Sequence, residues 1–357
     1  MKIILIGHGK LPIPPTGWGA VEQVIADISK NLASLGHEVE IVNIPHRHVL
    51  AALLLKRVRQ GKADVLWCHN ERLVPHLAWM YKLFSRHLVE TCHSPVPNTS
   101  AQELGKLLPV RRAAKSPVHL SLHPSLSEAF KLLNPAAKIV PLKNGVDVSS
   151  ITMSPQGNGR ALCLGRISER KRQRIVAEQF ADEGVPIDFV GPQSDTVPSN
   201  AKVSHLASYL GEWSREEVCN KLSNYSALVL WSDGEVQPLV VIEALAAGLD
   251  VVVSREAARN LDPTLSFVHV VDSIESLAET TKIAILGNKT RRSDIREYAK
   301  TNWDWPVVLE SVVQQIERGF EPVKYSSNSD VIQAKACVPI PPSHSPLNTP
   351  QSPRSEP

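Results

Sequence analysis

Short apolar runs alternate with amphipathic stretches along most of the chain. The run Lys2–Ile6 is followed by a loop rich in Gly and Pro. A helix pattern comes next, because apolar residues recur at the spacing of one helix face: Val21, Val24, Ile25, Ile28, Leu32 and Leu35. Gly36 is placed to end this helix. Repeated strand and helix patterns of this kind predict a parallel sheet whose faces are covered by helices.

The other apolar runs predict the strands of two such sheets. In the first half of the chain we expect strands at residues 38–44, 64–68, 87–92, 118–122 and 138–142. In the second half we expect strands at 160–164, 187–190, 227–231 and 251–253, with helices near 170–183, 214–223 and 238–248. The pattern restarts after Gly157-Asn158-Gly159, which predicts a hinge between two Rossmann-like domains.

Four segments follow from this pattern. Residues 1–157 and 158–304 are predicted to form the two Rossmann-like domains. A helix within residues 305–324 is expected to cross back to the first domain. Residues 325–357 are predicted to be a disordered tail, because the stretch 339–357 holds seven prolines and almost no large apolar groups.

The composition excludes several classes of protein. Apolar residues make up 43% of the chain, enough for a sizeable core, and the formal charge of +3 with few aromatic residues argues against nucleic-acid binding. The five cysteines are scattered and lack metal-site spacing, which favours a reducing compartment. The opening apolar run is too short for a signal segment, so we expect a cytoplasmic protein.

Two carboxylates stand eight residues apart in the second half of the chain. Glu235 lies in a loop after the predicted strand 227–231, and Glu243 lies early in the next helix, where Pro238 suits the first turn. Such carboxylates can accept hydrogen bonds from sugar hydroxyls, and the helix N-terminus can bind a phosphate. A solvated turn glutamate followed by an ordinary helix glutamate is the alternative interpretation.

A pair of cations follows the first predicted strand of the second domain. Arg166 comes directly after this strand, and Lys171 lies five residues further, at a predicted helix start. Two cations here would stabilise the negative charge of a departing diphosphate. A solvated basic helix start is the alternative, but cations at a helix N-terminus are electrostatically unfavourable unless an anion binds there.

His93 follows the strand predicted at 87–92, and His69 follows the strand predicted at 64–68. A lone histidine after a strand is more often structural than catalytic, and we interpret His69 as structural.

Trp18 and Gly19 stand in the loop that enters the first predicted helix. A glycine-bearing loop at a helix start lets backbone amides approach a phosphate, although a helix start that simply needs small residues has the same appearance. The stretch Asn144-Gly145-Val146-Asp147 contains a turn signal, and we assign it a structural role.

These motifs, in this order, resemble those of glycosyltransferase family 4. The family's E-x7-E segment matches Glu235 and Glu243, its G-R-x-x-x-x-K pattern matches residues 165–171, and its N-G-V-D matches residues 144–147. Many members also carry a histidine at the place of His93. The chain departs from the family twice. Ala20 stands where the family has a second glycine, and Gln237-Pro238 stands where many members have Phe-Gly.

The resemblance implies the GT-B architecture, an α/β fold of two Rossmann-like domains that face each other across a cleft. The first domain would offer the acceptor and the second would bind the nucleotide sugar. The implied reaction transfers a hexose from a nucleoside diphosphate sugar to an acceptor hydroxyl with retention, and needs neither metal nor cofactor. The acceptor could be a sugar, a lipid-linked group or a protein.

The resemblance also implies roles for individual residues. The catalytic group would be His93, Glu235, Arg166 and Lys171, with His93 and Glu235 against the donor sugar. Donor binding would add Glu243 on the ribose, and the backbone at Gly19, Leu239 and Val240 near the phosphates.

Other readings of the chain fit less well. The turn Gly7-His8-Gly9 invites a nicotinamide-dependent dehydrogenase, but Pro12 replaces the third glycine and no acidic residue follows the second strand. The Asp-x-Asp metal motif of a GT-A enzyme is missing from the sequence. A sugar-nucleotide epimerase of the same shape fits the two motif pairs poorly. A catalytically silent sugar-nucleotide or partner-binding protein of GT-B shape stays open.

Two stretches, residues 53–62 and 106–115, mix basic and apolar residues. This mixture is compatible with peripheral contact with a membrane, although a solvated amphipathic helix face explains it more simply.

Overall fold

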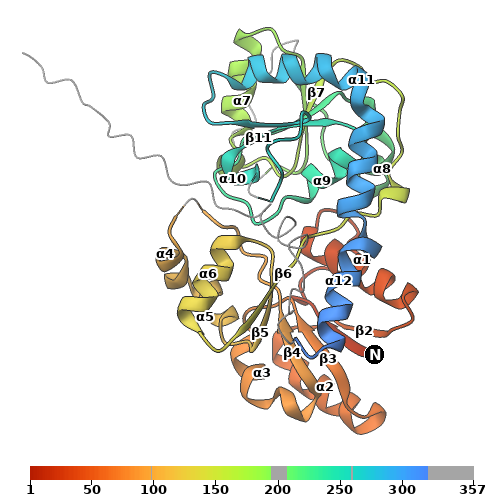
Figure 1. Ribbon diagram of the computed structural model, residues 1–357, viewed down its shortest axis with the longest axis vertical. Coiled ribbons are helices and arrows are strands. Elements are labelled where there is room, and N and C mark those ends of the chain that lie inside the picture. The colour runs from red at the N-terminus through yellow and green to blue at the C-terminus, as the bar shows by residue number, and fades with distance from the viewer. Residues whose placement is uncertain (98, 194–206, 259, 321–357) are drawn as a thin grey trace, which may run out of the picture. The chain divides into compact units, whose positions relative to one another are not determined.

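The computed structural model describes residues 1–320 except 98, 194–206 and 259. It contains two six-stranded sheets in which all neighbouring strands pair parallel (Figure 1). The first sheet has the order β2-β1-β3-β4-β5-β6. Its strands are β1 (Lys2–Ile6), β2 (Glu38–Val42), β3 (Ala63–Cys68), β4 (Ser85–Glu90), β5 (Val118–Ser121) and β6 (Lys138–Pro141).

The second sheet has the order β12-β11-β10-β7-β8-β9. Its strands are β7 (Ala161–Leu164), β8 (Ile187–Val190), β9 (Ala207–Tyr209), β10 (Ala227–Leu230), β11 (Asp250–Ser254) and β12 (Val268–Val271). Most of these strands are buried along their whole length, as expected when helices cover both faces of a parallel sheet. The predicted α/β fold class of two Rossmann-like sheets is therefore confirmed.

The helices of the first half join successive strands. The first, α1 (Ala20–Ser34), buries most of the apolar face that the periodicity predicted, and Gly19 is its N-cap residue. The others are α2 (His46–Gln60), α3 (Val74–Met80), α4 (Ala101–Lys106), α5 (Leu108–Ala113) and α6 (Pro124–Leu133).

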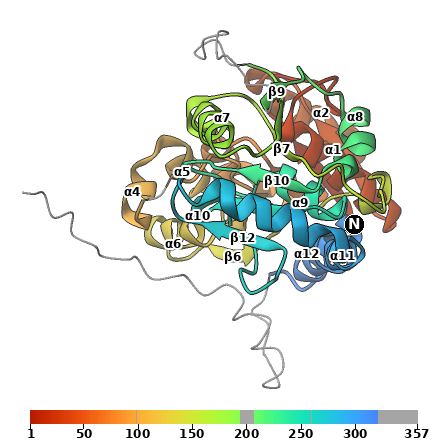
Figure 2. The same ribbon diagram turned by 90° about the horizontal axis from the view of Figure 1, so that it is seen from above.

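The helices of the second half are α7 (Gln173–Asp182), α8 (Arg215–Lys221), α9 (Leu239–Ala246), α10 (Arg255–Ala258) and α11 (Leu277–Trp303). The predicted helix 170–183 begins only at Gln173, because residues 169–171 form a separate 3-10 turn and Arg172 takes a left-handed backbone conformation with φ 52°. Helix α11 was not predicted from the sequence. It lies across the second sheet and contacts β10, β11 and β12 (Figure 2).

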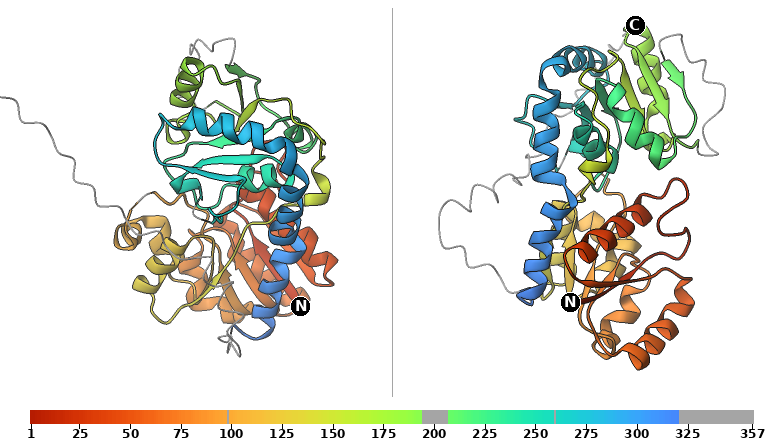
Figure 3. Two further views of the ribbon diagram at one scale, coloured as in Figure 1. Left: turned by 45° about the horizontal axis from the view of Figure 1, so that its top comes forward. Right: turned by 90° about the vertical axis from the view of Figure 1, so that its right-hand side faces the viewer.

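A last helix, α12 (Trp305–Glu317), follows α11 directly and contacts α1 (Figure 3). Its buried side chains join the apolar core of the first sheet and α1. The proposed boundaries at residues 157 and 304 stay predictions, and the predicted tail at 325–357 lies outside the described residues. Among the described residues no helix is both long and apolar enough to cross a membrane.

The chain that leaves the first half packs against the junction of α11 and α12. The Val146 amide donates to the Trp303 carbonyl over 2.8 Å, and the Trp305 amide donates to the Val146 carbonyl over 3.2 Å. A side chain at Gly145 would overlap the indole ring of Trp305. Gly145 is thus required for close approach, which agrees with the structural role predicted for this stretch.

The change Gly145→Ala is expected to lower the free energy of unfolding by about 1–3 kcal/mol, because the added methyl forces the fully buried Trp305 ring to move. Urea denaturation measures the change. Gly17→Ala is the matched control, since a side chain at Gly17 meets open space. An equal loss in both variants would contradict the explanation.

Candidate active site

Two glycines end neighbouring strands of the second sheet. Gly165 follows β7 with φ +146°, and Gly191 follows β8 with φ +141°. A side chain at Gly191 would overlap the carbonyl oxygen of Gly165, and one at Gly165 would lie 3.2 Å from the Lys171 Nζ atom. The two glycines therefore allow the chains to approach closely and leave room for the Lys171 ammonium beside the end of β7.

Glu235 forms ion pairs with two cationic side chains. It lies in the loop between β10 and α9, and its side chain is only 12% exposed. Its Oε1 atom lies 3.0 Å from Arg170 Nη1 and 3.2 Å from Lys171 Nζ. The Arg170 guanidinium also donates to the Gly234 carbonyl and the Ser232 hydroxyl, so it ties the turn after β7 to the loop after β10.

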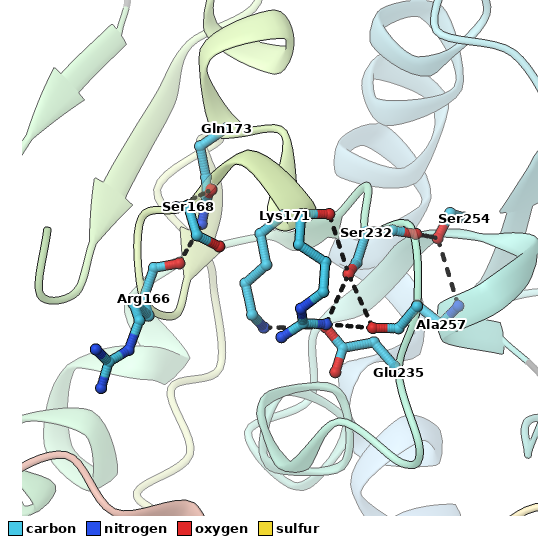
Figure 4. Close-up of polar contacts among 10 residues, drawn as sticks. Arg166, Ser168, Lys171, Gln173, Ser232, Glu235, Ser254 and Ala257 are labelled. Atoms are coloured by element: carbon cyan, nitrogen blue, oxygen red, sulfur yellow. Dashed lines mark hydrogen bonds and ion pairs between the residues drawn. The ribbon is translucent and has the colours of Figure 1, made fainter. Parts of the chain in front are cut away.

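Arg166 does not join this cluster. Its side chain is exposed and extends away from Glu235 and Lys171 (Figure 4). In the part of the chain that the structure describes, its guanidinium forms no hydrogen bond or ion pair, whereas its carbonyl accepts from Gln173 Nε2. The structure therefore brings Lys171 and Glu235 together and leaves the Arg166 charge available to an anion.

The N-terminus of α9 presents two backbone donors. Helix α9 begins at Leu239 after Pro238, and the first hydrogen bond of this turn runs from the Val241 amide to the Pro238 carbonyl. Within the described ranges, the amides of Leu239 and Val240 have no acceptor, as is usual for the first turn of a helix. These donors and the positive end of the helix dipole favour an anion there.

Glu243 lies in the same helix and is only 6% exposed. Its Oε1 atom pairs with Nη1 of Arg215, the first residue of α8. The carboxylate beside it raises the pKa of Arg215 further above its ordinary value. Burial raises the pKa of the nearby Asp27 carboxyl on α1. The ion pair with Arg215 thus fixes the orientation of the Glu243 carboxylate, and its second oxygen can accept a hydrogen bond from a ligand.

Residues of the first half reach the loop that carries Glu235. The Gln237 Oε1 atom accepts from the Asn144 amide over 2.5 Å, and the Gln237 carbonyl accepts from Asn144 Nδ2 over 3.2 Å. Asn260 Nδ2 donates both to the Val236 carbonyl and to the Leu122 carbonyl. Gln237 therefore fixes the entry to α9 by hydrogen bonds.

The loop before α1 lies against the second half. Trp18 packs on the apolar cluster that contains Val241 and Ile242 of α9. Gly19 is confined by its neighbours, because a side chain there would lie 3.0 Å from Pro15 and 3.1 Å from the Glu22 carboxylate. The loop predicted to approach the donor is thus placed beside α9, while the predicted role of Gly19 in phosphate binding stays a prediction.

Histidines follow three adjacent strands of the first sheet. His8 follows β1, His69 follows β3 and His93 follows β4 shortly after Glu90. The Nδ1 atom of His69 lies 2.9 Å from Nε2 of His93, and their rings are within 21° of parallel. Burial lowers the pKa of His93 to about 3 and that of His69 well below its usual range, with His8 adding to both shifts.

Both rings of this pair are therefore neutral at pH 7, and one nitrogen of the hydrogen bond must be the donor. The His69 Nε2 atom is buried without a partner. A buried N–H without an acceptor is rarer than an acceptor without a donor. The favoured arrangement therefore places the hydrogen on His69 Nδ1, which donates to His93 Nε2 and leaves an N–H on His93 Nδ1 for a ligand.

The depressed pKa values predict a loss of stability in acid. Between pH 6.5 and pH 3 the unfolded chain binds a proton at His93 that the folded chain does not bind, so the free energy of unfolding falls as the pH falls. We expect the decline between pH 6 and pH 5 to be shallower in His93→Asn by about 1 kcal/mol per pH unit. Urea denaturation at several pH values measures both slopes, and equal slopes would contradict the assignment.

Sequence reasoning did not assign three residues to this site. Arg170 and Arg215 look like surface charges in the sequence, and the structural role predicted for His69 stays a prediction. Their partners are Glu235, Glu243 and His93, and each pair joins different elements. The excess of positive charge before α7 was the one usable signal for Arg170.

Known structures share this fold. No protein-family model matches the sequence, and a search of curated proteins finds no match. Sucrose-phosphate synthase from Thermosynechococcus elongatus is similar at 14% identity and TM-score 0.71, covering 89% of this chain and 98% of that one. The Anabaena protein HepE, solved in complex with UDP and glucose, is similar at 17% identity and TM-score 0.67, covering 89% and 100%.

The lipopolysaccharide outer core galactosyltransferase WaaB, solved in its apo form, is similar at 15% identity and TM-score 0.65, covering 89% of this chain and 99% of that one. The chain thus has the GT-B architecture, with two Rossmann-like sheets, that these solved structures share.

Proposed function

We propose that the protein is a glycosyltransferase that moves a hexose from a nucleoside diphosphate sugar to an acceptor hydroxyl, with retention of configuration. One observation carries this proposal. The Lys171–Glu235 ion pair lies after the neighbouring strands β7 and β10, and the same loop leads to the open amides of α9 and to the buried Glu243. The shared fold with HepE, solved with UDP and glucose, supports it.

The proposed site divides the donor into three parts. The ribose hydroxyls donate to the free oxygen of Glu243. The diphosphate accepts from the amides of Leu239 and Val240 and receives the charges of Arg166 and Lys171. When Lys171 pairs with the diphosphate instead of Glu235, the Glu235 carboxylate keeps its ion pair with Arg170. It can then accept a hydrogen bond from a hydroxyl of the sugar.

In the proposed reaction the bond between the anomeric carbon and the diphosphate oxygen breaks, and the acceptor oxygen bonds to that carbon from the same face. The acceptor proton passes to an oxygen of the leaving diphosphate. Arg166 and Lys171 stabilise the negative charge that develops on the leaving group, which is the role of a metal ion in other enzymes. His93, neutral at pH 7, would donate a hydrogen bond to the sugar.

The cysteines support a reducing compartment, and we propose the cytoplasm. Cys68, Cys92 and Cys163 are buried as free thiols, and burial raises the pKa of each to about 12. Such thiols are inert toward disulfide exchange.

Thermal denaturation in EDTA tests the proposed function. A ligand that binds only the folded protein raises the melting temperature. We expect a rise with one of UDP-, GDP- or ADP-glucose, and a loss of this rise in Arg166→Ala and Glu243→Ala. No rise with any nucleotide sugar, from a well-folded sample, would contradict the proposal and favour a silent protein of GT-B shape.

A further inference from the structure

A basic pocket lies in the first half of the molecule, apart from the residues already assigned to the donor. It has a volume of about 680 Å³ and is lined by His46, Arg72, Pro75, His76, Leu108 and Arg112. The first comes from the start of α2, the next three from around the start of α3, and the last two from α5. Small-molecule sites commonly have volumes of about 300–1,000 Å³, so the pocket can hold a phosphorylated sugar.

The lining of this pocket is strongly one-sided in charge. Two lining residues are arginines, two are histidines, and none carries a carboxylate. Over the residues that the structure describes, the guanidinium groups of Arg72 and Arg112 form no hydrogen bond or ion pair. Like charges that share a pocket repel each other, and a bound anion removes that repulsion. A guanidinium matches a phosphate through two parallel hydrogen bonds.

The pocket adjoins the side of the first sheet where the three histidines lie. Arg72 follows His69 by three residues, and its amide donates to the Asn70 side-chain oxygen over 3.2 Å. His69 in turn bonds to His93. Burial lowers the pKa of His8, the carboxylate of Glu71 opposes this shift, and the charge of Arg72 adds a smaller lowering effect. An anion held by Arg72 would therefore lie beside the end of the sheet where the acceptor is expected.

We propose that this pocket binds the phosphate group of a phosphorylated acceptor, an inference that rests on the proposed glycosyltransferase function. Arg72 and Arg112 bind the phosphate oxygens, and the acceptor hydroxyl reaches the donor near His93. The exposed Leu108 and the adjacent Pro75 supply an apolar wall that suits either a sugar ring or the start of a lipid chain. The phosphate is the feature that both sources share.

Calorimetric titration of the full chain with glucose 6-phosphate tests this assignment. Glucose is the uncharged control, and a separate titration with UDP measures the donor site. We expect glucose 6-phosphate to bind and glucose to bind at least tenfold more weakly. Arg72→Ala and Arg112→Ala should each weaken glucose 6-phosphate binding at least tenfold without changing UDP affinity. Arg111→Ala is the matched control, because Arg111 is an exposed arginine of the same helix that does not line the pocket.

A second arm separates the two sources of phosphate. Sedimentation with phosphatidylcholine vesicles, with or without phosphatidic acid, measures binding of a lipid phosphate. Binding to either anionic probe that is lost in Arg112→Ala but kept in Arg111→Ala supports the proposal, and the probe that binds identifies the source. Binding to neither probe, or an equal loss in Arg111→Ala, would overturn it. Failure of UDP, GDP and ADP alike to bind would instead count against the proposed function.

Discussion

Replacing Lys171 with methionine is expected to slow release of nucleoside diphosphate from the donor by about 10²–10³-fold. Methionine keeps an unbranched side chain but removes the charge. Because the Lys171 side chain is only 12% exposed, water cannot fully replace the lost ammonium group. Because negative charge grows on the diphosphate only as the bond breaks, kcat should fall much more than KM rises.

Steady-state assays of nucleoside diphosphate release measure this effect. Arg174→Met is the matched control. Arg174 follows the same turn, but its side chain is 66% exposed and, among the described residues, forms an ion pair only with Glu178 in the next turn of α7. A loss of similar size in Arg174→Met would mean that general positive charge, rather than the placement of Lys171, supports the reaction.

Replacing Glu243 with alanine is expected to weaken binding of the nucleoside diphosphate by about 10–100-fold, the effect of losing hydrogen bonds to a charged group. Glu243 is held by Arg215 and almost fully buried, so it is oriented before the ligand arrives. Loss of this carboxylate removes the ribose contact directly.

Calorimetric titration with the nucleoside diphosphate measures the change. Glu178→Ala is the control, because it removes an exposed carboxylate whose ion pair in the described part of the chain is with Arg174 on the same helix. Unchanged affinity in Glu243→Ala would exclude this residue from nucleotide binding. Thermal denaturation of the same variant shows whether the substitution damages the fold.

Ten of the twelve strands that the structure describes could be predicted because they are short, largely apolar and bounded by turn residues, whereas the edge strands β9 and β12 were not predicted. The core strands β7, β8, β10 and β11 bury every residue, and such runs stand out in a sequence. Helix α11 could not be predicted in this way. It buries the polar side chains of Asn288 and Arg292, which interrupt the apolar periodicity on which helix prediction depends.

Arg292 shows why these buried polar groups are stable. Its guanidinium donates to the carbonyls of Ser223 and Tyr225 and to the Asn288 side chain, and so satisfies backbone groups at the ends of other elements. The two carbonyl partners are far away in the sequence, and no local pattern reveals them. The same reason explains why the Arg215–Glu243 and His69–His93 pairs were missed.

The candidate site was predictable in part, because its motifs lie at strand ends. Glu235, Glu243 and Lys171 could be selected from spacing and from the placement of charges at helix starts. The pairing of Glu235 with Arg170 and Lys171 requires β7 and β10 to be neighbours, and this strand order is a property of the whole sheet.

A crystal structure with the nucleoside diphosphate that stabilises the protein tests the central claim most directly. We predict that the diphosphate oxygens lie within hydrogen-bond distance of the Leu239 and Val240 amides and of Lys171, with the ribose on Glu243. A nucleotide bound elsewhere, or a diphosphate out of reach of both α9 and Lys171, would contradict the proposed donor site.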